Sequence, residues 1–271
     1  MSSTHLGRDI DTTRPHSARM YDYYLGGKDH FAIDKQGAEA AAEANPNVFV
    51  AARENRAFMH RATRALAQEH GIRQWLDIGT GIPTEPNVHQ VAQSVVPEAR
   101  VVYADNDPLV LKYAERLMRS SPQGRTAYIE ADFHDPDSLL DAPELGEVLD
   151  LSQPIALSLN ALLHFVTDDA DPYGIVGRLM AALPSGSALA LSHVTPEFDP
   201  PAWEKVADLY TGAGTPVRFR TKAEVARFFE GLDLLDPGLT VCHRWRPERA
   251  DGAETPTDLQ VSLWAGVGIK P

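Results

Sequence analysis

The 271-residue sequence contains a single cysteine, Cys242, which excludes an intrachain disulfide and a cysteine-rich metal site. No apolar run approaches the ~20 residues of a membrane-spanning helix, and the polar stretch 1–14 lacks the apolar core of a signal peptide. Cys242 itself falls in a predicted strand, so we expect a buried, inert thiol. These absences predict a soluble, cytoplasmic protein without a membrane partner.

Basic residues are too few to balance the acidic ones. The chain has 25 lysines and arginines against 38 aspartates and glutamates, which gives a formal charge of −13. Residues 1–70 have equal numbers of acidic and basic side chains, so residues 71–271 carry the whole excess of negative charge. Because such a body repels a phosphate backbone, whereas a neutral or cationic small molecule meets no barrier, we predict a small-molecule partner and no nucleic acid.

The spacing of apolar residues predicts two regions, a helical cap over residues 1–70 and an α/β domain over residues 71–271. In the cap, helices are expected at 15–25, ending at the glycine pair 26–27, at about 31–44, and from residue 45 onward.

After residue 74, short apolar strands alternate with helices, which is typical of a parallel sheet covered on both faces. Three Asp-Pro pairs mark helix starts, because the acid caps the helix and proline suits its first position. The pairs are Asp107-Pro108, Asp135-Pro136 and Asp171-Pro172. We expect strands near 74–79, 100–105, 126–131, 154–160 and 187–194, helices at about 200–211 and 221–231, and two final apolar runs at 239–245 and 260–269.

The stretch 75–81, Trp-Leu-Asp-Ile-Gly-Thr-Gly, has the pattern of a strand followed by a glycine turn. Gly79 and Gly81 lack a Cβ, so the backbone can turn sharply and a flat ligand can lie against it. Asp105 ends the next strand, 24 positions after Gly81, near the distance at which a strand-end acid meets a ribose hydroxyl pair. The pattern predicts a nucleoside site. Capping of the next helix is the alternative role for Asp105, but Asp107 is better placed for it.

The residues after Gly81 distinguish between two classes of nucleotide. A dinucleotide needs free backbone N–H groups for its pyrophosphate, but Pro83 and Pro86 have none, and Thr84 replaces the third glycine of the dinucleotide fingerprint. Glu85 would also lie close to a phosphate. The loop therefore favours an adenosyl ligand without phosphates, of which S-adenosyl-L-methionine (SAM) is the commonest.

Residues 77–81 resemble the first motif of class I SAM-dependent methyltransferases. More narrowly, residues 18–29, 87–89 and 105–108 resemble a bacterial family of predicted S-adenosyl methyltransferases without an established substrate, and the likeness runs over nearly the whole chain. The resemblance implies a Rossmann-like seven-stranded sheet, with five parallel strands and a C-terminal antiparallel pair, and SAM as the cofactor. Pro83 departs from the general class, in which many members have a third alternate glycine there.

The expected cofactor contacts follow the strand ends and the cap. Asp77 either accepts the backbone N–H groups of the glycine turn or contacts the cofactor's amino group. The resemblance implies a polar group near the adenine at Asp132 and an aromatic ring at Phe133, although Asp132 could instead cap the helix near Asp135. The full set of expected contacts is Asp77, Gly79, Thr80, Gly81, Asp105, Asn106, Asp132, Phe133, Asn160 and Arg19.

Two residues are candidates for contact with the methyl acceptor. His164 follows the fourth strand and could take a proton from a hydroxyl or amine, or it could only line the pocket; His193 is a weaker candidate of the same kind. Tyr21 lies in a predicted lid with Arg19, in which the arginine binds the methionine carboxylate and the tyrosine faces the acceptor. Asn55 and Arg56 offer a second way to hold that carboxylate.

The sequence therefore predicts a SAM-dependent methyltransferase that acts on a small molecule by in-line displacement. A SAM-binding regulator without turnover is the alternative, and a space next to the donor methyl group would distinguish the two. A nicotinamide oxidoreductase is disfavoured by the loop 82–86. No spacing of histidines indicates a metal site.

Overall fold

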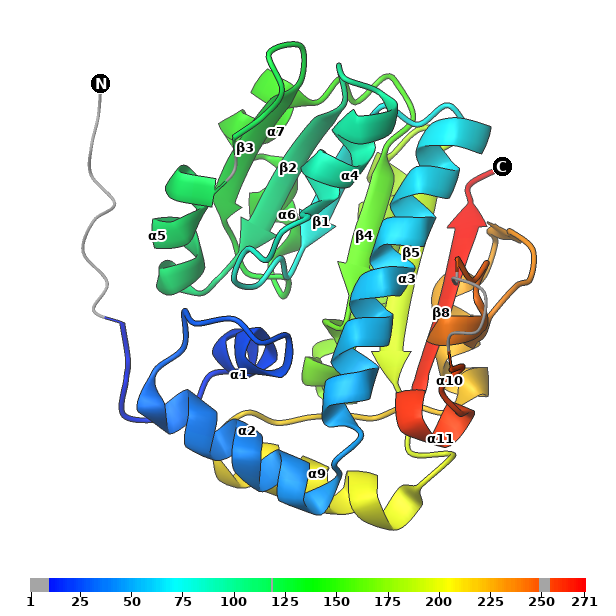
Figure 1. Ribbon diagram of the computed structural model, residues 1–271. Helices are drawn as coiled ribbons and strands as arrows, with labels where there is room; N and C mark the ends of the chain where they lie inside the picture. Colours follow the sequence, from blue (N-terminus) through cyan, green and yellow to red (C-terminus); the bar gives the residue numbers. More distant parts are fainter. Residues whose placement is uncertain (1–9, 118, 249–253) are drawn as a thin grey trace.

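The protein is built on one mixed sheet (Figure 1). The structure is a computed structural model that describes residues 10–117, 119–248 and 254–271. The strand order is β3-β2-β1-β4-β5-β8-β6, and β7 also pairs with β8. The first five strands run parallel and β8 is antiparallel to β5. The strands are β1 Gln74–Ile78, β2 Arg100–Asp105, β3 Arg125–Glu130, β4 Ala156–Asn160, β5 Ala188–Val194, β6 Asp233–Leu234, β7 Thr240–Val241 and β8 Leu263–Ile269.

The five parallel strands confirm the predicted fold class and fall within about two residues of the expected positions. All residues of β1 and β5 are buried, because helices cover both faces of the sheet. The helices are α1 Ser17–Tyr24, α2 Ala32–Ala44, α3 Val48–Glu69, α4 Val88–Val95, α5 Pro108–Leu117, α6 Pro136–Leu140, α7 Pro143–Val148, α8 Pro172–Ala182, α9 Pro200–Gly212, α10 Lys222–Ala226 and α11 Asp258–Val261.

Each of the three Asp-Pro pairs named above begins a helix as predicted. The Asp135 side chain accepts a hydrogen bond from the Ser138 N–H, and Asp171 accepts one from the Gly174 N–H. Asp107 accepts one from the Leu109 N–H at 2.8 Å.

The C-terminal pair differs from the expectation in one respect. The predicted strand 239–245 is limited to β7, and residues 242–244 form a 3₁₀ turn. Arg61 of α3 explains the break: its guanidinium donates to the main-chain oxygens of Cys242 (2.7 Å) and Trp245 (2.8 Å), which are thereby withdrawn from the sheet. A further short strand, β6, takes the free edge of β8, so the sheet has eight strands. Cys242 is fully buried, and burial raises the pKa of its thiol, as expected of an inert cysteine.

The N-terminal helices divide into two groups. α3 lies along one face of the sheet, whereas α1 and α2 lie with α9 beyond the carboxyl ends of the parallel strands (Figure 1). α2 packs on α9 although the two are far apart in the sequence. Within the described residues, no helix combines the length and apolarity that a bilayer span demands. This arrangement encloses the space beyond the strand ends, where open α/β sheets bind ligands.

Candidate functional site

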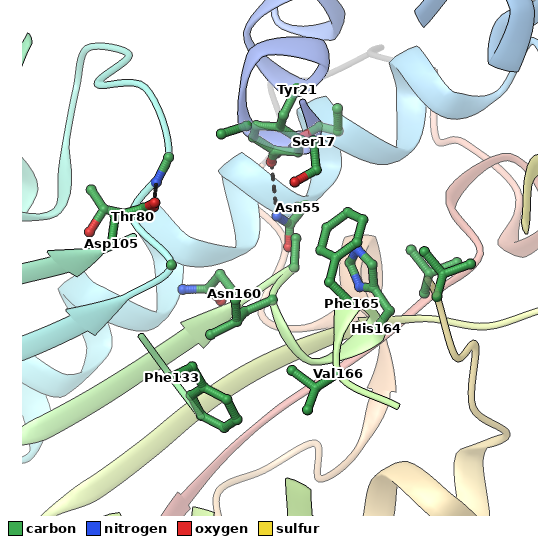
Figure 2. A pocket seen from close by; sticks show the side chains of 18 of the residues that line it. Ser17, Tyr21, Asn55, Thr80, Asp105, Phe133, Asn160, His164, Phe165 and Val166 are labelled. Carbon is green, nitrogen blue, oxygen red and sulfur yellow. Dashed lines mark hydrogen bonds between the residues drawn. The ribbon is translucent and has the colours of Figure 1, made fainter. Parts of the chain in front are cut away.

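One cavity of about 320 Å³ lies at the carboxyl ends of the strands, beneath α1 and α9. Figure 2 shows residues from the β1 and β2 ends, the β4 end and α1 around it. Arg19 and the weaker candidate His193 do not line it. The other predicted site residues do: Tyr21, Asp77, Gly79, Thr80, Gly81, Asp105, Asn106, Asp132, Phe133, Asn160 and His164.

The glycine turn after β1 requires glycine at both predicted positions. Gly79 and Gly81 have φ values of 72° and 66°, in the left-handed region that other residues rarely adopt. The Gly79 N–H donates to the Ala104 main-chain oxygen at 2.8 Å, and the Gly81 N–H donates to the Asp105 carboxylate at 2.7 Å. The turn is thus fixed by β2, the neighbouring strand.

Asp105 takes part in two backbone hydrogen bonds at the edge of the cavity. Besides the Gly81 N–H, its carboxylate accepts the Asp107 N–H at 3.0 Å. Its side chain is almost buried, and burial raises its pKa. Each carboxylate oxygen has two lone pairs and accepts one of these bonds, so each keeps an acceptor site for a ligand hydroxyl.

The loop 82–87 confirms that the turn is unlike a dinucleotide loop. α4 begins only at Val88, with Asn87 as its N-cap, so the helix N-terminus is separated from the glycine turn. Asn87 also accepts the Thr84 N–H (3.1 Å), while Arg56 donates to the main-chain oxygens of Pro86 (2.9 Å) and Thr84. These bonds fix the loop and bring the Arg56 guanidinium to the cavity wall.

Asp77 lies at the end of β1 with little exposure. Burial raises the pKa of its carboxyl to about 6, against the opposing effects of a Ser158 hydrogen bond and the Arg56 charge. The glycine-turn N–H groups bond Ala104 and Asp105 rather than this carboxylate. The turn is therefore held by other groups, and the Asp77 carboxylate faces the cavity.

The end of β3 supplies the next part of the wall. Asp132 accepts the His134 N–H at 3.0 Å, and Asp135 is the N-cap of α6, so Asp132 does not cap that helix. Phe133 is buried beside it and lines the cavity (Figure 2).

Asn160 lies between the two ends of the cavity (Figure 2). Its Nδ2 donates to Ser158 Oγ at 2.7 Å, whereas its buried Oδ1 has no partner among the described residues. A buried amide oxygen without a donor is costly, so this atom marks a place for a ligand N–H or O–H group.

The two histidines differ in their surroundings. His164 lines the cavity, and its Nδ1 has no hydrogen-bond partner within the described part of the chain. Burial, with the neighbouring His193 and Arg220, lowers its pKa well below the usual range, so the ring is neutral. His193 donates from Nδ1 to the Val194 oxygen (2.7 Å) and accepts from Arg220 at Nε2 (3.0 Å). His193 is therefore a structural residue outside the cavity lining.

Tyr21 is fixed in the cavity wall by two hydrogen bonds. Its hydroxyl donates to the Ala52 oxygen (3.1 Å) and accepts from Asn55 Nδ2 (2.9 Å), and burial raises its pKa (Figure 2). Asn55 in turn accepts from Ser192 Oγ on β5. Asn55 thus links α1 to β5, and Arg56 brings a positive charge to the cavity wall.

Arg19 lies outside the cavity, which corrects its predicted place in the lid. Its guanidinium donates to the Asp11 oxygen at 2.9 Å and lies 3.4 Å from the Asp34 carboxylate of α2. Residues two apart on a helix do not share a face. Since Tyr21 points into the cavity, Arg19 points toward α2.

Of the far end of the cavity, only His164 was predicted. We call this end the acceptor chamber; its wall comes from α1, α3, α9, the turn after β4 and residues 217–219. The lining includes Tyr24, Met59, His164, Phe165, Trp203, Val206, Tyr210, Val217 and Phe219. Trp203, Val206 and Tyr210 recur at i, i+3 and i+7, a signal of one apolar helix face. That spacing identifies a buried face but not what the face encloses.

The comparisons with known proteins match the whole chain. A family model described as S-adenosyl methyltransferase covers residues 3–271. A DUF574 family protein from Streptomyces avermitilis is 51% identical, with 97% of this chain and 100% of that chain covered and a TM-score of 0.93. A candidate methyltransferase from Thermobifida fusca is 36% identical, with 96% and 97% covered and a TM-score of 0.88.

More distant structures share the fold alone. The plantazolicin methyltransferase BamL, solved with S-adenosylhomocysteine and a desmethyl-plantazolicin analogue, is 11% identical with a TM-score of 0.54, and 93% of this chain and 95% of that chain are covered. A search of the curated proteins gave no match. The family model and the two close structures each cover nearly the whole chain. The chain belongs to the S-adenosyl methyltransferase family, whose cofactor is SAM.

Proposed function

We propose that the protein transfers the methyl group of SAM to a small molecule held in the acceptor chamber, by in-line displacement. One observation carries this proposal: the cavity is continuous from the glycine turn to the acceptor chamber. A regulator that only bound SAM would need no space there, so the chamber favours turnover over the regulatory alternative.

The residues at the β1–β3 end fit the cofactor. In this proposal Asp105 accepts from the ribose hydroxyls, and Phe133 and Asp132 contact the adenine. Arg56 supplies a positive charge for the methionine carboxylate, while Asp77 and Asn160 Oδ1, which has no partner among the described residues, supply acceptors for its amino group. The set is complementary to a ligand that carries one carboxylate and one ammonium.

When bound, the cofactor supplies a methyl group on a positively charged sulfur. The protein's contribution is to align the acceptor with that group and to exclude water, and alignment contributes up to ~7–11 kcal/mol in favourable cases. Tyr21, held by Asn55 and Ala52, gives the cap a fixed position over the cavity. His164 is the neutral group in the chamber that can accept a proton.

Binding and transfer can be tested separately. Calorimetric titration should show binding of SAM and none of NAD, because the turn offers no pyrophosphate site. Incubation with methyl-labelled SAM and a bacterial extract should place the label in the small-molecule fraction. Binding of NAD instead of SAM, or label recovered only in protein or nucleic acid, would contradict the proposal.

A further inference from the structure

The charged and apolar lining residues occupy opposite ends of the cavity. Arg56, Asp77, Asp105 and Asp132 all lie at the end formed by β1, β2 and β3 and the adjoining part of α3. The acceptor chamber lies over β4, β5 and β8 and has no acidic or basic lining residue other than the neutral His164. Every residue of this lining belongs to the described part of the chain.

This separation limits the charge of an acceptor. A carboxylate, phosphate or ammonium in the chamber would lose its hydration without gaining a partner of opposite charge, which costs several kcal/mol. An uncharged molecule pays no such penalty and gains from contact with the apolar wall. The chamber therefore discriminates against charged molecules.

The wall also favours a flat ring. Trp203 and Phe219 meet edge to face with ring centroids 5.4 Å apart, and Phe165 and Tyr210 meet with centroids 5.8 Å apart. These four rings belong to the turn after β4, to α9 and to the segment after it. Aromatic pairs prefer offset or edge-to-face partners, so a ring compound can extend both clusters.

The position of His164 indicates that the nucleophilic group of the acceptor is a hydroxyl. The His164 ring centroid lies 4.4 Å from that of Phe165 and 6.2 Å from that of Phe219, so His164 belongs to the same aromatic wall. Its Nδ1 has no hydrogen-bond partner among the described residues. An aliphatic amine would enter mainly as an ammonium, for which the chamber holds no carboxylate. A hydroxyl is uncharged until it reacts and then needs a group that takes its proton.

We propose that the acceptor is an uncharged, largely apolar ring compound with a hydroxyl group, and that the product is its methyl ether. The acceptor oxygen forms the bond to the methyl carbon, the methyl–sulfur bond breaks with its electron pair going to sulfur, and the hydroxyl proton passes to His164. This proposal rests on the proposed function, because it assigns a substrate class to the same cavity.

The test uses two probes that differ in one charge, 2-naphthol and 6-hydroxy-2-naphthoate. Binding of each to the full chain is measured by calorimetry, with and without S-adenosylhomocysteine, and methyl ether formation with SAM is measured by mass spectrometry. We expect 2-naphthol to bind at least roughly tenfold more tightly than the naphthoate and to be methylated. Equal or tighter binding of the naphthoate, or no binding of either, would overturn the substrate class. Since the probes are also titrated without cofactor, failure of SAM to bind is a separate result: it contradicts the proposed function and with it methyl ether formation, whereas the probe affinities still test the charge preference of the chamber.

A variant pair on one helix locates the probe. Trp203→Leu removes an aromatic wall, whereas Leu209→Ala changes an exposed residue on the same helix, where Leu209 is 40% exposed. We expect Trp203→Leu to weaken 2-naphthol binding roughly tenfold and to leave SAM affinity unchanged, while Leu209→Ala changes neither. Should Trp203→Leu not fold, Phe219→Leu serves the same purpose. Unchanged 2-naphthol affinity in a folded variant would show that the probe binds elsewhere and overturn the proposal.

Discussion

The Asp105 carboxylate accepts a hydrogen bond from the Gly81 N–H at 2.7 Å, and so joins the end of β2 to the glycine turn after β1. The same side chain accepts the Asp107 N–H, one residue before α5 begins. The acid thus fixes the shape of the turn from the side that faces the cavity. Its structural role at the turn and its proposed role in ribose binding therefore fall on one residue.

Replacing Asp105 should therefore weaken SAM binding, and the loss of its two backbone hydrogen bonds should also lower stability. A hydrogen bond to a charged group contributes about 1.5–3 kcal/mol, so we expect Asp105→Ala to weaken SAM binding roughly 10- to 150-fold. Asp135→Ala is the matched control, because it removes a carboxylate that bonds a backbone N–H at another helix start. Calorimetry should show unchanged SAM affinity for the control. Wild-type SAM affinity in the Asp105→Ala protein would show that Asp105 does not bind the ribose.

Arg56 and Arg19 should behave in opposite ways. Arg56→Gln removes the positive charge of the cavity wall, so we expect SAM affinity to fall roughly tenfold or more. Arg19→Gln removes a buried partner of Asp34 and should lower the free energy of unfolding by about 3–5 kcal/mol. Calorimetry and urea unfolding distinguish the two effects. If Arg19→Gln lost SAM affinity without losing stability, Arg19 would contact the cofactor after all.

The raised pKa of Asp77 predicts that the free energy of unfolding depends on pH. Its pKa is raised from 3.8 to about 6, mainly by burial, so the folded state holds the proton more tightly than the unfolded state. The stabilisation is full below about pH 4 and is lost as the pH rises to about 6. Two pKa units correspond to about 3 kcal/mol, so Asp77→Asn should be more stable than wild type by up to that amount at about pH 7. Urea unfolding at several pH values should show the two curves meeting at about pH 4; a variant less stable at neutral pH would refute this reading of Asp77.

His164 should affect turnover rather than cofactor binding. We expect His164→Gln to lower kcat roughly 10²–10⁴-fold with a hydroxyl acceptor, with SAM affinity unchanged. Because its pKa lies well below the usual range, the wild-type rate should show no loss from protonation of this residue near pH 6. His134→Gln, a change of an exposed histidine at the other end of the cavity, is the control. Equal kcat values for the His164 variant and wild type would exclude it as the proton acceptor.

Local patterns were sufficient to predict the five parallel strands and the glycine turn that lines one end of the cavity. The glycine turn, Asp105 and the Asp-Pro helix starts depend on residues close together in the sequence, whose backbone geometry is set by Gly, Pro and Asp themselves. The five parallel strands follow from apolar runs that are buried on both faces. These features were predictable because few other arrangements satisfy them.

Contacts between distant segments were not predictable. Arg61 ends β7 by bonding carbonyls about 180 positions later in the chain, and no local pattern shows it. Arg19 faces α2 because Asp34 is buried there, a contact between two helices of the cap. The acceptor chamber likewise exists only because α9 returns beneath α1 and α2, which its apolar spacing does not specify.

The most direct measurement of the central claim is a crystal structure of the protein with S-adenosylhomocysteine. We expect the ribose hydroxyls to bind Asp105, the adenine to lie beside Phe133 and the carboxylate to bind Arg56. The sulfur should point toward the acceptor chamber. A ligand bound with its ribose away from Asp105, or with its sulfur facing solvent instead of the chamber, would contradict this claim.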